Sequence, residues 1–214
     1  MTGPQHPAPV RALISLRALA HNAALARAAG ATHADVGRDA WGHGAAECAA
    51  VLTDAGLSLH DGDSAADGVL ADPLTLWGLP GGQGTPVMRL RGSVLSTKRL
   101  RTGEGVSYGY RFRAAHDTVI GLVSGGYAQG IVRSLGGAAT VQVAGGAVPI
   151  VGRVAMDACV VDLEGVDAAA GDDVVFFGDP AQGDPDLASW ERATGLRASE
   201  IVSLVGARAR EVVP

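Results

Sequence analysis

The sequence predicts an α+β chain that is mainly β, with a short α/β segment over residues 1–85 and a mostly antiparallel β domain over residues 86–214. Apolar residues recur at helical spacing in the first third, whereas short β-branched runs separated by glycine pairs dominate afterwards. The glycine-rich stretch Pro80–Pro86 (PGGQGTP) lies between the two patterns and is typical of a linker. A chain of 214 residues is long enough to bury a sizeable core in such an arrangement.

The first part alternates between strand and helix signals. An apolar run opens it, a helix with apolar residues on one face follows and ends at Gly30, and a second strand, a turn and a second helix come next. These elements are expected at Ala12–Leu16, Arg17–Ala29, Thr32–Val36, Asp39–Gly44 and Ala45–Ala55. The acidic stretch His60–Gly68 (HDGDSAADG) predicts a loop, and Val69–Leu79 is apolar again.

The second part consists of short strands. The expected runs are Val87–Leu100, Thr118–Ser124, Thr140–Val143, Val148–Val154, Ala158–Leu163 and Asp173–Phe177. Their β-branched content and glycine-rich spacing favour an antiparallel sheet. We expect a helix over Asp184–Thr194 and a further helix over Ser199–Val205 before a terminal strand.

Composition excludes several classes of function. The formal charge of −5 and the pI near 5.6 provide no basic field for nucleic acid or an anionic membrane. The sequence has no apolar run of ~18 residues, which predicts no membrane span, and its first ten residues lack the pattern of a signal peptide. Cys48 and Cys159 lack metal-ligand spacing, so we expect a reduced, cytoplasmic setting without a metal site.

Lysine is almost absent from the chain. Lys98 is the one lysine, against sixteen arginines. An enzyme that holds an aldehyde cofactor as a Schiff base needs a lysine amine, and the guanidinium of arginine has no nucleophilic lone pair at working pH. Any such chemistry in this chain therefore depends on Lys98 alone.

From Val87 onward the sequence resembles the PLP-dependent alanine racemases. The matching motifs are Gly103–Gly109 (GEGVSYG), Gly126–Gly130 (GYAQG), Val148–Asp157 (VPIVGRVAMD), Gly171–Gly178 (GDDVVFFG) and the closing Glu200–Arg210. Fainter matches in the first part are Ile14–Asn22, Val36–Gly44 and Ala71–Gly78. The resemblance implies a racemase-like C-terminal β domain preceded by a truncated remnant of a (β/α)₈ barrel, because a whole barrel takes ~200 residues or more.

The resemblance also implies that the cofactor contacts are lost. The position of the Schiff-base lysine falls on Gly37, and that of the arginine at the pyridine nitrogen falls on Ala71. A glycine whose N–H approaches the phosphate is replaced by Pro73, which has no N–H, and a phosphate-contacting tyrosine falls on Ala207. We therefore expect no bound cofactor, although the family uses PLP.

The residues that the family lends across its dimer interface are better preserved. Tyr108 matches the catalytic tyrosine, Tyr127 and Met156 match substrate-lining residues, and Asp157 follows them. The departures from the family pattern are Phe112, Gln129, Ala155 and Ala158.

Simpler interpretations exist for four of these residues. Tyr108 could persist because its turn packs it, Met156 could fill the core, and Asp157 could cap a turn. His43 lies in a GHG turn that looks exposed, where a histidine is usually inert.

Three functions follow from this pattern. The first is an alanine-racemase homologue that is inactive by itself. The second is an interaction module that docks onto an intact racemase-like subunit and either lends Tyr108 in trans or blocks the entrance with its GYAQG loop. The resemblance implies a homodimer, or a heterodimer with such a subunit. The third is a residual PLP-dependent racemase, which the missing amine at position 37 disfavours.

Overall fold

A computed structural model describes residues 9–63, 65–107 and 109–213, and the chain packs as two compact units. Unit 1 consists of Leu90–Leu196 with the described residues up to Arg11, and unit 2 consists of Ala12–Arg89 with the chain from Arg197 onward. The break at 89/90 lies close to the boundary that the sequence predicts at 85/86. The chain from Arg197 onward, however, packs with the α/β part, whereas the sequence assigns it to the β domain. The division into domains at 85/86 therefore stays a prediction.

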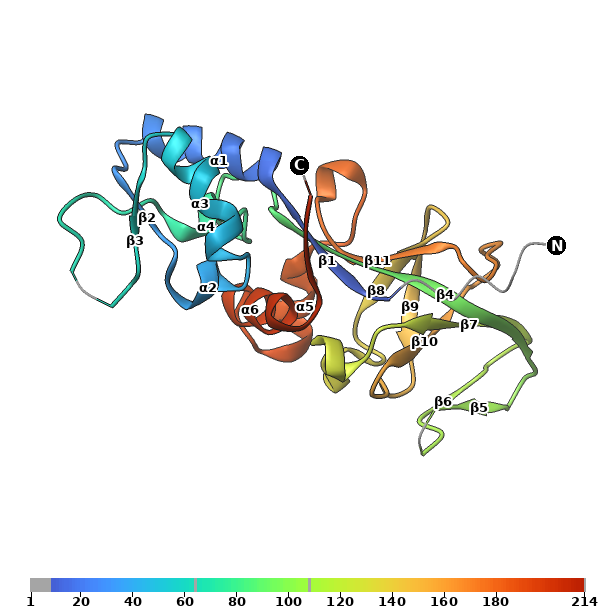
Figure 1. Ribbon diagram of the computed structural model, residues 1–214. Coiled ribbons are helices and arrows are strands. Elements are labelled where there is room, and N and C mark those ends of the chain that lie inside the picture. The colour runs from blue at the N-terminus through green and yellow to red at the C-terminus, as the bar shows by residue number, and fades with distance from the viewer. Residues whose placement is uncertain (1–8, 64, 108, 214) are drawn as a thin grey trace. The chain divides into compact units, whose positions relative to one another are not determined.

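Unit 1 is built on a six-stranded antiparallel barrel (Figure 1). Its strands are β4 (Met88–Leu100), β7 (Thr118–Ser124), β8 (Thr140–Val143), β9 (Gly146–Val151), β10 (Ala158–Asp162) and β11 (Asp173–Phe177). They are ordered β11-β8-β9-β10-β7-β4, and β11 also pairs with β4, which closes the sheet on itself. The sequence predicted the bounds of β7, β8 and β11 correctly. It extended β9 to Val154, but the strand ends at Val151 because Gly152 turns the chain with a φ of 68°.

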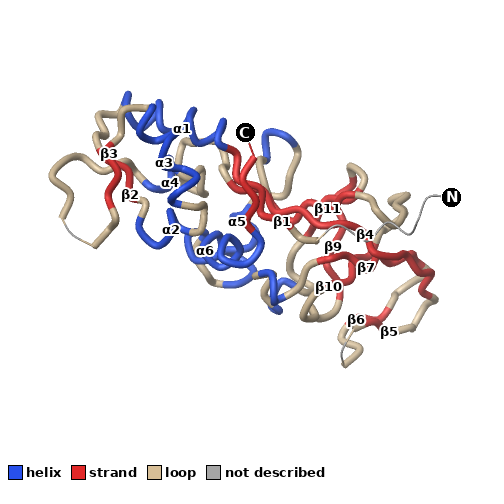
Figure 2. The backbone as a smooth tube through the Cα atoms, in the orientation of Figure 1, coloured by secondary structure: helices blue, strands red, loops and turns tan. Residues whose placement is uncertain are grey.

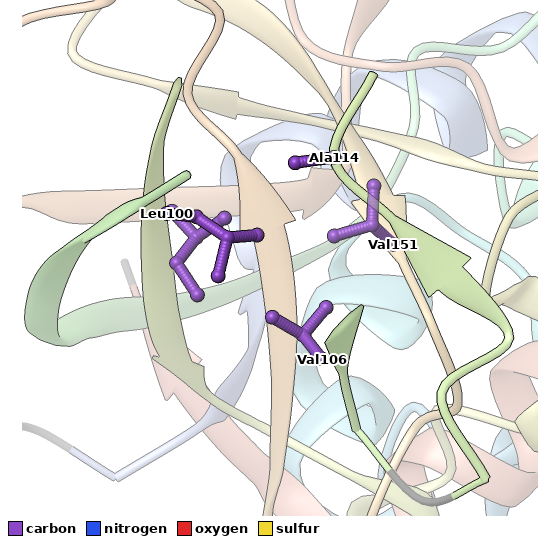
Figure 3. Close-up of a cluster of buried hydrophobic side chains, with 5 residues drawn as sticks. Leu100, Val106, Ala114 and Val151 are labelled. Atoms are coloured by element: carbon purple, nitrogen blue, oxygen red, sulfur yellow. The ribbon is translucent and has the colours of Figure 1, made fainter. Parts of the chain in front are cut away.

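A two-stranded hairpin, β5 (Gly105–Val106) and β6 (Phe112–Arg113), accompanies the barrel. Beneath it lies a cluster of buried apolar side chains, shown in Figure 3, to which Phe112 adds a partly buried ring. The buried members are Leu100, Val106, Ala114, Ile120 and Val151. Because this cluster joins the hairpin to β4, β7 and β9, it fixes the base of the loop that contains Ser107.

The rest of unit 1 consists of short helices. They are the 3₁₀ turns η1 (Tyr127–Gln129), η2 (Arg133–Leu135) and η3 (Pro180–Gln182), and the helix α5 (Leu187–Thr194). The helix starts later than predicted because the Asp186 side chain accepts from the Ala188 N–H and so caps it. Trp190 of this helix is fully buried, with its ring edge-on to Phe177 at 5.1 Å.

Unit 2 is the α/β part, in which more residues lie in helices, blue in Figure 2, than in strands. Its elements are β1 (Arg11–Ser15), α1 (Leu16–Ala28), β2 (His33–Asp35), α2 (Gly37–Trp41), α3 (Ala45–Asp54), β3 (Ser58–His60), α4 (Pro73–Leu76), α6 (Ala198–Ala209) and β12 (Arg210–Val213). Two parallel pairs form, β1 with β12 and β2 with β3. The β2–β3 pair is joined through α2 and α3, which is the strand–helix connection of a (β/α)₈ barrel. The prediction that His60 opens a loop is wrong, because it ends β3.

A buried asparagine joins the first helix of unit 2 to the linker. Asn22 is fully buried; its Nδ2 donates to the carbonyls of Leu76 (3.1 Å) and Thr85 (2.8 Å), and its Oδ1 accepts from the Thr85 N–H at 2.8 Å. Three hydrogen bonds satisfy this side chain, so the PGGQGTP segment is held against α1 rather than left free.

Candidate functional site

A pocket of about 470 Å³ opens on unit 1, and its lining comes from three loops. The lining residues are Ser107, Tyr127, Arg133, Arg153, Val154, Ala155 and Met156. Two of them, Tyr127 and Met156, are candidates from the sequence, and the structure brings these two together. Their roles as substrate contacts stay predictions.

Backbone hydrogen bonds hold the GYAQG and VAMD loops together. The Tyr127 N–H donates to the Ala155 carbonyl and the Ala128 N–H to the Met156 carbonyl, both at 3.0 Å. A Cβ at Gly126 would lie 2.3 Å from the Met156 oxygen, so only glycine allows this approach. The glycine that begins GYAQG therefore sets the relative position of Tyr127 and Met156.

Gln129 explains one departure from the family pattern. Its Oε1 accepts from the Gly126 N–H at 3.0 Å, and its Nε2 donates to Asp157 Oδ1 at 3.2 Å. An amide can do both because it carries an acceptor and a donor, whereas a carboxylate here would face the Asp157 carboxylate without a donor. Asp157 thus helps to hold the two loops together through Gln129, and its role at the substrate stays a prediction.

Two arginines that the sequence analysis did not select give the pocket its charge. The Arg133 guanidinium lies over the Tyr127 ring, 4.6 Å from its centroid. Arg153 lines the pocket from the loop that also contains Met156. Arginine binds carboxylates through a planar fork of N–H donors, so the pocket suits a small anion. Arg153 lies inside the quoted motif VPIVGRVAMD, which could have signalled it, whereas nothing in the sequence marks Arg133.

Met156 is 55% exposed. The alternative that it fills the core is therefore wrong, because a core methionine would be enclosed by apolar neighbours.

Ser107 fixes the third loop of the pocket. Its Oγ donates to the Arg153 carbonyl at 2.7 Å and accepts from the Arg153 N–H at 3.0 Å. A Cβ at Gly152 would lie 2.7 Å from the Ser107 Cβ, so the two loops touch at this point. Tyr108, the predicted catalytic tyrosine, lies outside the described residues.

In unit 2, the loop that the resemblance assigns to the cofactor lysine forms a left-handed turn. Four consecutive residues without a glycine, Arg38 to Trp41, have φ values of 52–57°. This conformation is unfavourable for L-residues and persists only where neighbouring contacts hold it. Arg210 forms an ion pair with Asp39, and the Ser203 hydroxyl donates to the Trp41 carbonyl at 3.3 Å.

The same ion pair shifts the acidity of Asp39. Burial raises the pKa of this carboxyl, but the hydrogen bonds from Arg210 and from the Ala45 N–H outweigh burial, so its pKa lies below the usual value. Asp39 is therefore charged at neutral pH, which keeps the turn attached to Arg210.

Gly37 has no space for a side chain. A Cβ built there would lie 2.4 Å from the Asp61 carbonyl oxygen and 2.9 Å from Asp35 Oδ1. The Asp35 carboxylate also accepts from the Gly37 N–H at 2.8 Å. The start of the acidic loop thus occupies the place where a side chain of residue 37 would begin.

The other positions assigned to the cofactor are equally unsuited. Ala71 is buried and offers only a methyl group, Pro73 has no N–H, and Ala207 is an exposed methyl. The Asp72 side chain caps α4 by accepting from the N–H groups of Leu74 and Thr75. The residues present in unit 2 do not fit pyridoxal phosphate.

His43 is not the exposed turn residue that the sequence suggested. It is fully buried, and its ring stacks on Trp77 with centroids 4.7 Å apart and planes 17° apart. Its Nδ1 lies 2.9 Å from the Ala40 carbonyl, so Nδ1 must hold the hydrogen. Burial lowers the pKa of His43 to about 4.

This histidine should make the stability of unit 2 depend on pH. The folded state binds its proton at about pH 4, and the unfolded state near pH 6.5, so stability is full above 6.5 and falls as the pH drops toward 4. We expect the free energy of unfolding to fall by about 2 kcal/mol between pH 7.5 and pH 5. Urea titrations at each pH measure this, with His43→Phe as the comparison because a ring without a titrating nitrogen should flatten the curve. An equal slope in both proteins would contradict the assignment.

The two cysteines and Lys98 are not among the residues that line the pocket on unit 1. Cys48 and Cys159 are both free and buried, and burial raises the pKa of each thiol to about 12, so neither is a ready nucleophile. Among the residues that the structure describes, no three His, Cys, Asp or Glu side chains gather as metal ligands. Lys98 is exposed on β4, where it pairs with Ile120 of β7.

The described part of the chain also has no helix with the length and apolar character needed to cross a bilayer.

A closed antiparallel barrel with an arginine-lined pocket, joined in sequence to strand–helix units, defines the class: a chain with an antiparallel β domain and an α/β segment. The model of the alanine racemase C-terminal domain matches residues 87–213, and the chain belongs to the alanine racemase family. The alanine racemase of Beutenbergia cavernae is 43% identical over 129 residues, which are 60% of this chain and 34% of that protein. The alanine racemase of Mycobacterium leprae is 42% identical over 125 residues, 58% of this chain and 32% of that protein.

The chain thus spans about a third of the length of the curated relatives it matches. Solved structures extend the likeness in fold. The alanine racemase of Streptomyces lavendulae aligns with a TM-score of 0.88 at 21% identity, covering 98% of both chains. That of Streptomyces coelicolor aligns with a TM-score of 0.85 at 21% identity, covering 95% of this chain and 97% of the other. The alignments therefore reach the segment before residue 87, which the family model leaves unmatched.

Proposed function

We propose that this chain is an alanine-racemase homologue that does not racemise amino acids by itself. The observation that supports this most directly is at Gly37, where the Asp61 carbonyl stands 2.4 Å from the place of a Cβ. The family is PLP-dependent, and its chemistry needs a lysine amine at the cofactor. Lys98, the one lysine, belongs to unit 1 on an exposed strand.

A cofactor titration tests the proposal. Purified protein is mixed with PLP, reduced with borohydride and mapped by mass spectrometry, and L-alanine is assayed for conversion to the D form. We expect no pyridoxyl group at a defined residue and no racemisation above a PLP-only control, because no lysine stands in unit 2. A stoichiometric adduct on Lys98 with turnover that Lys98→Arg abolishes would show a residual racemase instead.

A second function is favoured by the pocket on unit 1. Its loops are held by their own contacts, among them the Ser107–Arg153 and Gln129–Asp157 hydrogen bonds, and none of these requires a cofactor. A surface that is organised without its own cofactor site suits presentation to another subunit. We therefore propose, as the alternative, an interaction module that pairs with an intact racemase-like subunit and offers Tyr108 in trans.

Sedimentation of the pure chain, alone and mixed with an intact alanine racemase, tests this alternative. A mixed complex whose racemisation rate changes with the wild-type chain but not with Tyr108→Phe would support lending in trans. Absence of any complex at micromolar concentrations would contradict it. We place the protein in the cytoplasm as part of the same proposal, because both cysteines are free.

A further inference from the structure

The His60 ring contacts the Asp61–Gly62 junction in a way that neither function above uses. His60 ends β3, its side chain is only 9% exposed, and its carbonyl accepts from the Val36 N–H at 2.8 Å. The Gly62 N–H donates to His60 Nδ1 at 3.5 Å, and the same nitrogen lies 3.6 Å from Asp61 Oδ1. One ring nitrogen on a fixed strand therefore faces both the carboxyl of Asp61 and the amide that follows it.

We propose that Asp61–Gly62 is a modification site, at which His60 promotes cyclisation of Asp61 to a succinimide and its conversion to isoaspartate. This inference does not rest on the proposed function. Glycine after aspartate leaves the attacking amide without a Cβ to shield it, and the Asp61 side chain is 74% exposed, so water reaches it.

The reaction balances without any other reactant. The Gly62 nitrogen attacks Asp61 Cγ, a C–N bond forms and the C–OH bond of the protonated carboxyl breaks. The amide proton passes to His60 Nδ1 and leaves with the hydroxyl group as water. Water then opens the ring at either carbonyl, and opening at the α-carbonyl yields isoaspartate. Histidine suits this role because a ring nitrogen that carries no hydrogen can accept the amide proton and pass it on.

The chain contains an internal comparison at Asp67–Gly68. Here His33 is also close, but its two nitrogens are already engaged: Nε2 with Asp67 Oδ1 at 2.8 Å and Nδ1 with the Thr32 hydroxyl at 2.9 Å. The Val69 N–H and carbonyl are bonded to Thr32 as well, which fixes the backbone after Gly68. Neither nitrogen is free to accept the amide proton, so this second junction should react more slowly.

Isoaspartate at position 61 would alter the backbone contact between Asp61 and Gly37. The Asp61 carbonyl that lies beside Gly37 would become part of a free α-carboxylate, and the chain would run through the former side chain. The loop would lengthen by one backbone carbon and place a negative charge next to Asp35, which itself bonds the Gly37 N–H. Modification at this one residue therefore changes the backbone contact that leaves no room for a side chain at position 37.

The test is an ageing experiment on the full chain at neutral pH and 37 °C. Isoaspartate is located by electron-transfer fragmentation and quantified with an isoaspartyl methyltransferase. We expect it to form at residue 61 at least about threefold faster than at residue 67 in the folded protein, and at similar rates in urea. His60→Gln should slow residue 61 by about tenfold, a fraction of what a well-placed general base supplies in enzymes, and leave residue 67 unchanged.

The comparison in urea makes the result independent of how well the variant folds. Equal rates at the two junctions in the folded wild-type protein overturn the proposal. So does a His60→Gln protein that remains folded by circular dichroism and forms isoaspartate at residue 61 at the wild-type rate.

Discussion

Restoring a lysine at position 37 is expected to destabilise the protein without giving it a cofactor. The first side-chain atom of Gly37→Lys would lie 2.4 Å from the Asp61 carbonyl oxygen, a backbone atom that can move only with its loop. Such overpacking costs about 2–3 kcal/mol, and we expect the melting temperature to fall by about 5–10 °C. Differential scanning calorimetry and a PLP titration measure the two outcomes.

Two comparison variants isolate the cause. Gly37→Ala adds only the Cβ, so it should cost nearly as much as lysine if the contact with Asp61 is responsible. Arg38→Lys places an amine one residue away, on a side chain that is 82% exposed, and should change the stability by less than about 0.5 kcal/mol. A Gly37→Lys protein with wild-type stability and a borohydride-trapped PLP adduct would contradict this prediction. It would show that the Asp61 loop moves at little cost and that one substitution restores cofactor binding.

Removing the Asn22 side chain is expected to give the largest loss of stability. Asn22→Ala leaves the buried Leu76 carbonyl and the half-buried N–H and carbonyl of Thr85 without their partner. Each unsatisfied buried group costs about 1–3 kcal/mol, partly relieved by water. We expect a loss of about 3–4 kcal/mol, measured by urea unfolding.

His21→Ala is the matched control, because His21 precedes Asn22 on the same helix and is exposed. Its effect should stay within about 0.5 kcal/mol. Hydrogen exchange gives a second measurement: the amides around Thr85 should lose protection in Asn22→Ala, since their attachment to α1 is lost. Unchanged protection there, or equal effects of the two substitutions, would show that other contacts hold the linker.

The strands of unit 1 could be predicted well because alternation and glycine pairs mark them directly. β7, β8 and β11 have the predicted bounds. β3 was missed because three residues are too few to show a period, and its last residue, His60, begins an acidic run. His43 was expected at the surface because glycines flank it. It is buried because Trp77, far along the chain, stacks on its ring.

The candidate site could likewise be predicted only in part. Tyr127 and Met156 could be chosen because each lies in a short ordered motif, and the structure places them in one pocket. Arg133 could not, because only the 3₁₀ turns after Gly126 bring its guanidinium over the Tyr127 ring. The bond between Gln129 and Asp157 joins residues from two motifs, and sequence alone does not show which side chains meet.

The sequence by itself determined which chemical groups the chain possesses: one lysine, a glycine at position 37 and a proline at position 73. It also determined the family, because ordered motifs depend only on the order of residues. The tertiary structure alone decided that position 37 is closed as well as empty, since the Asp61 carbonyl reaches it from another strand's end. Close packing is a property of atoms in space, and contacts between distant residues leave no mark in either residue type or spacing.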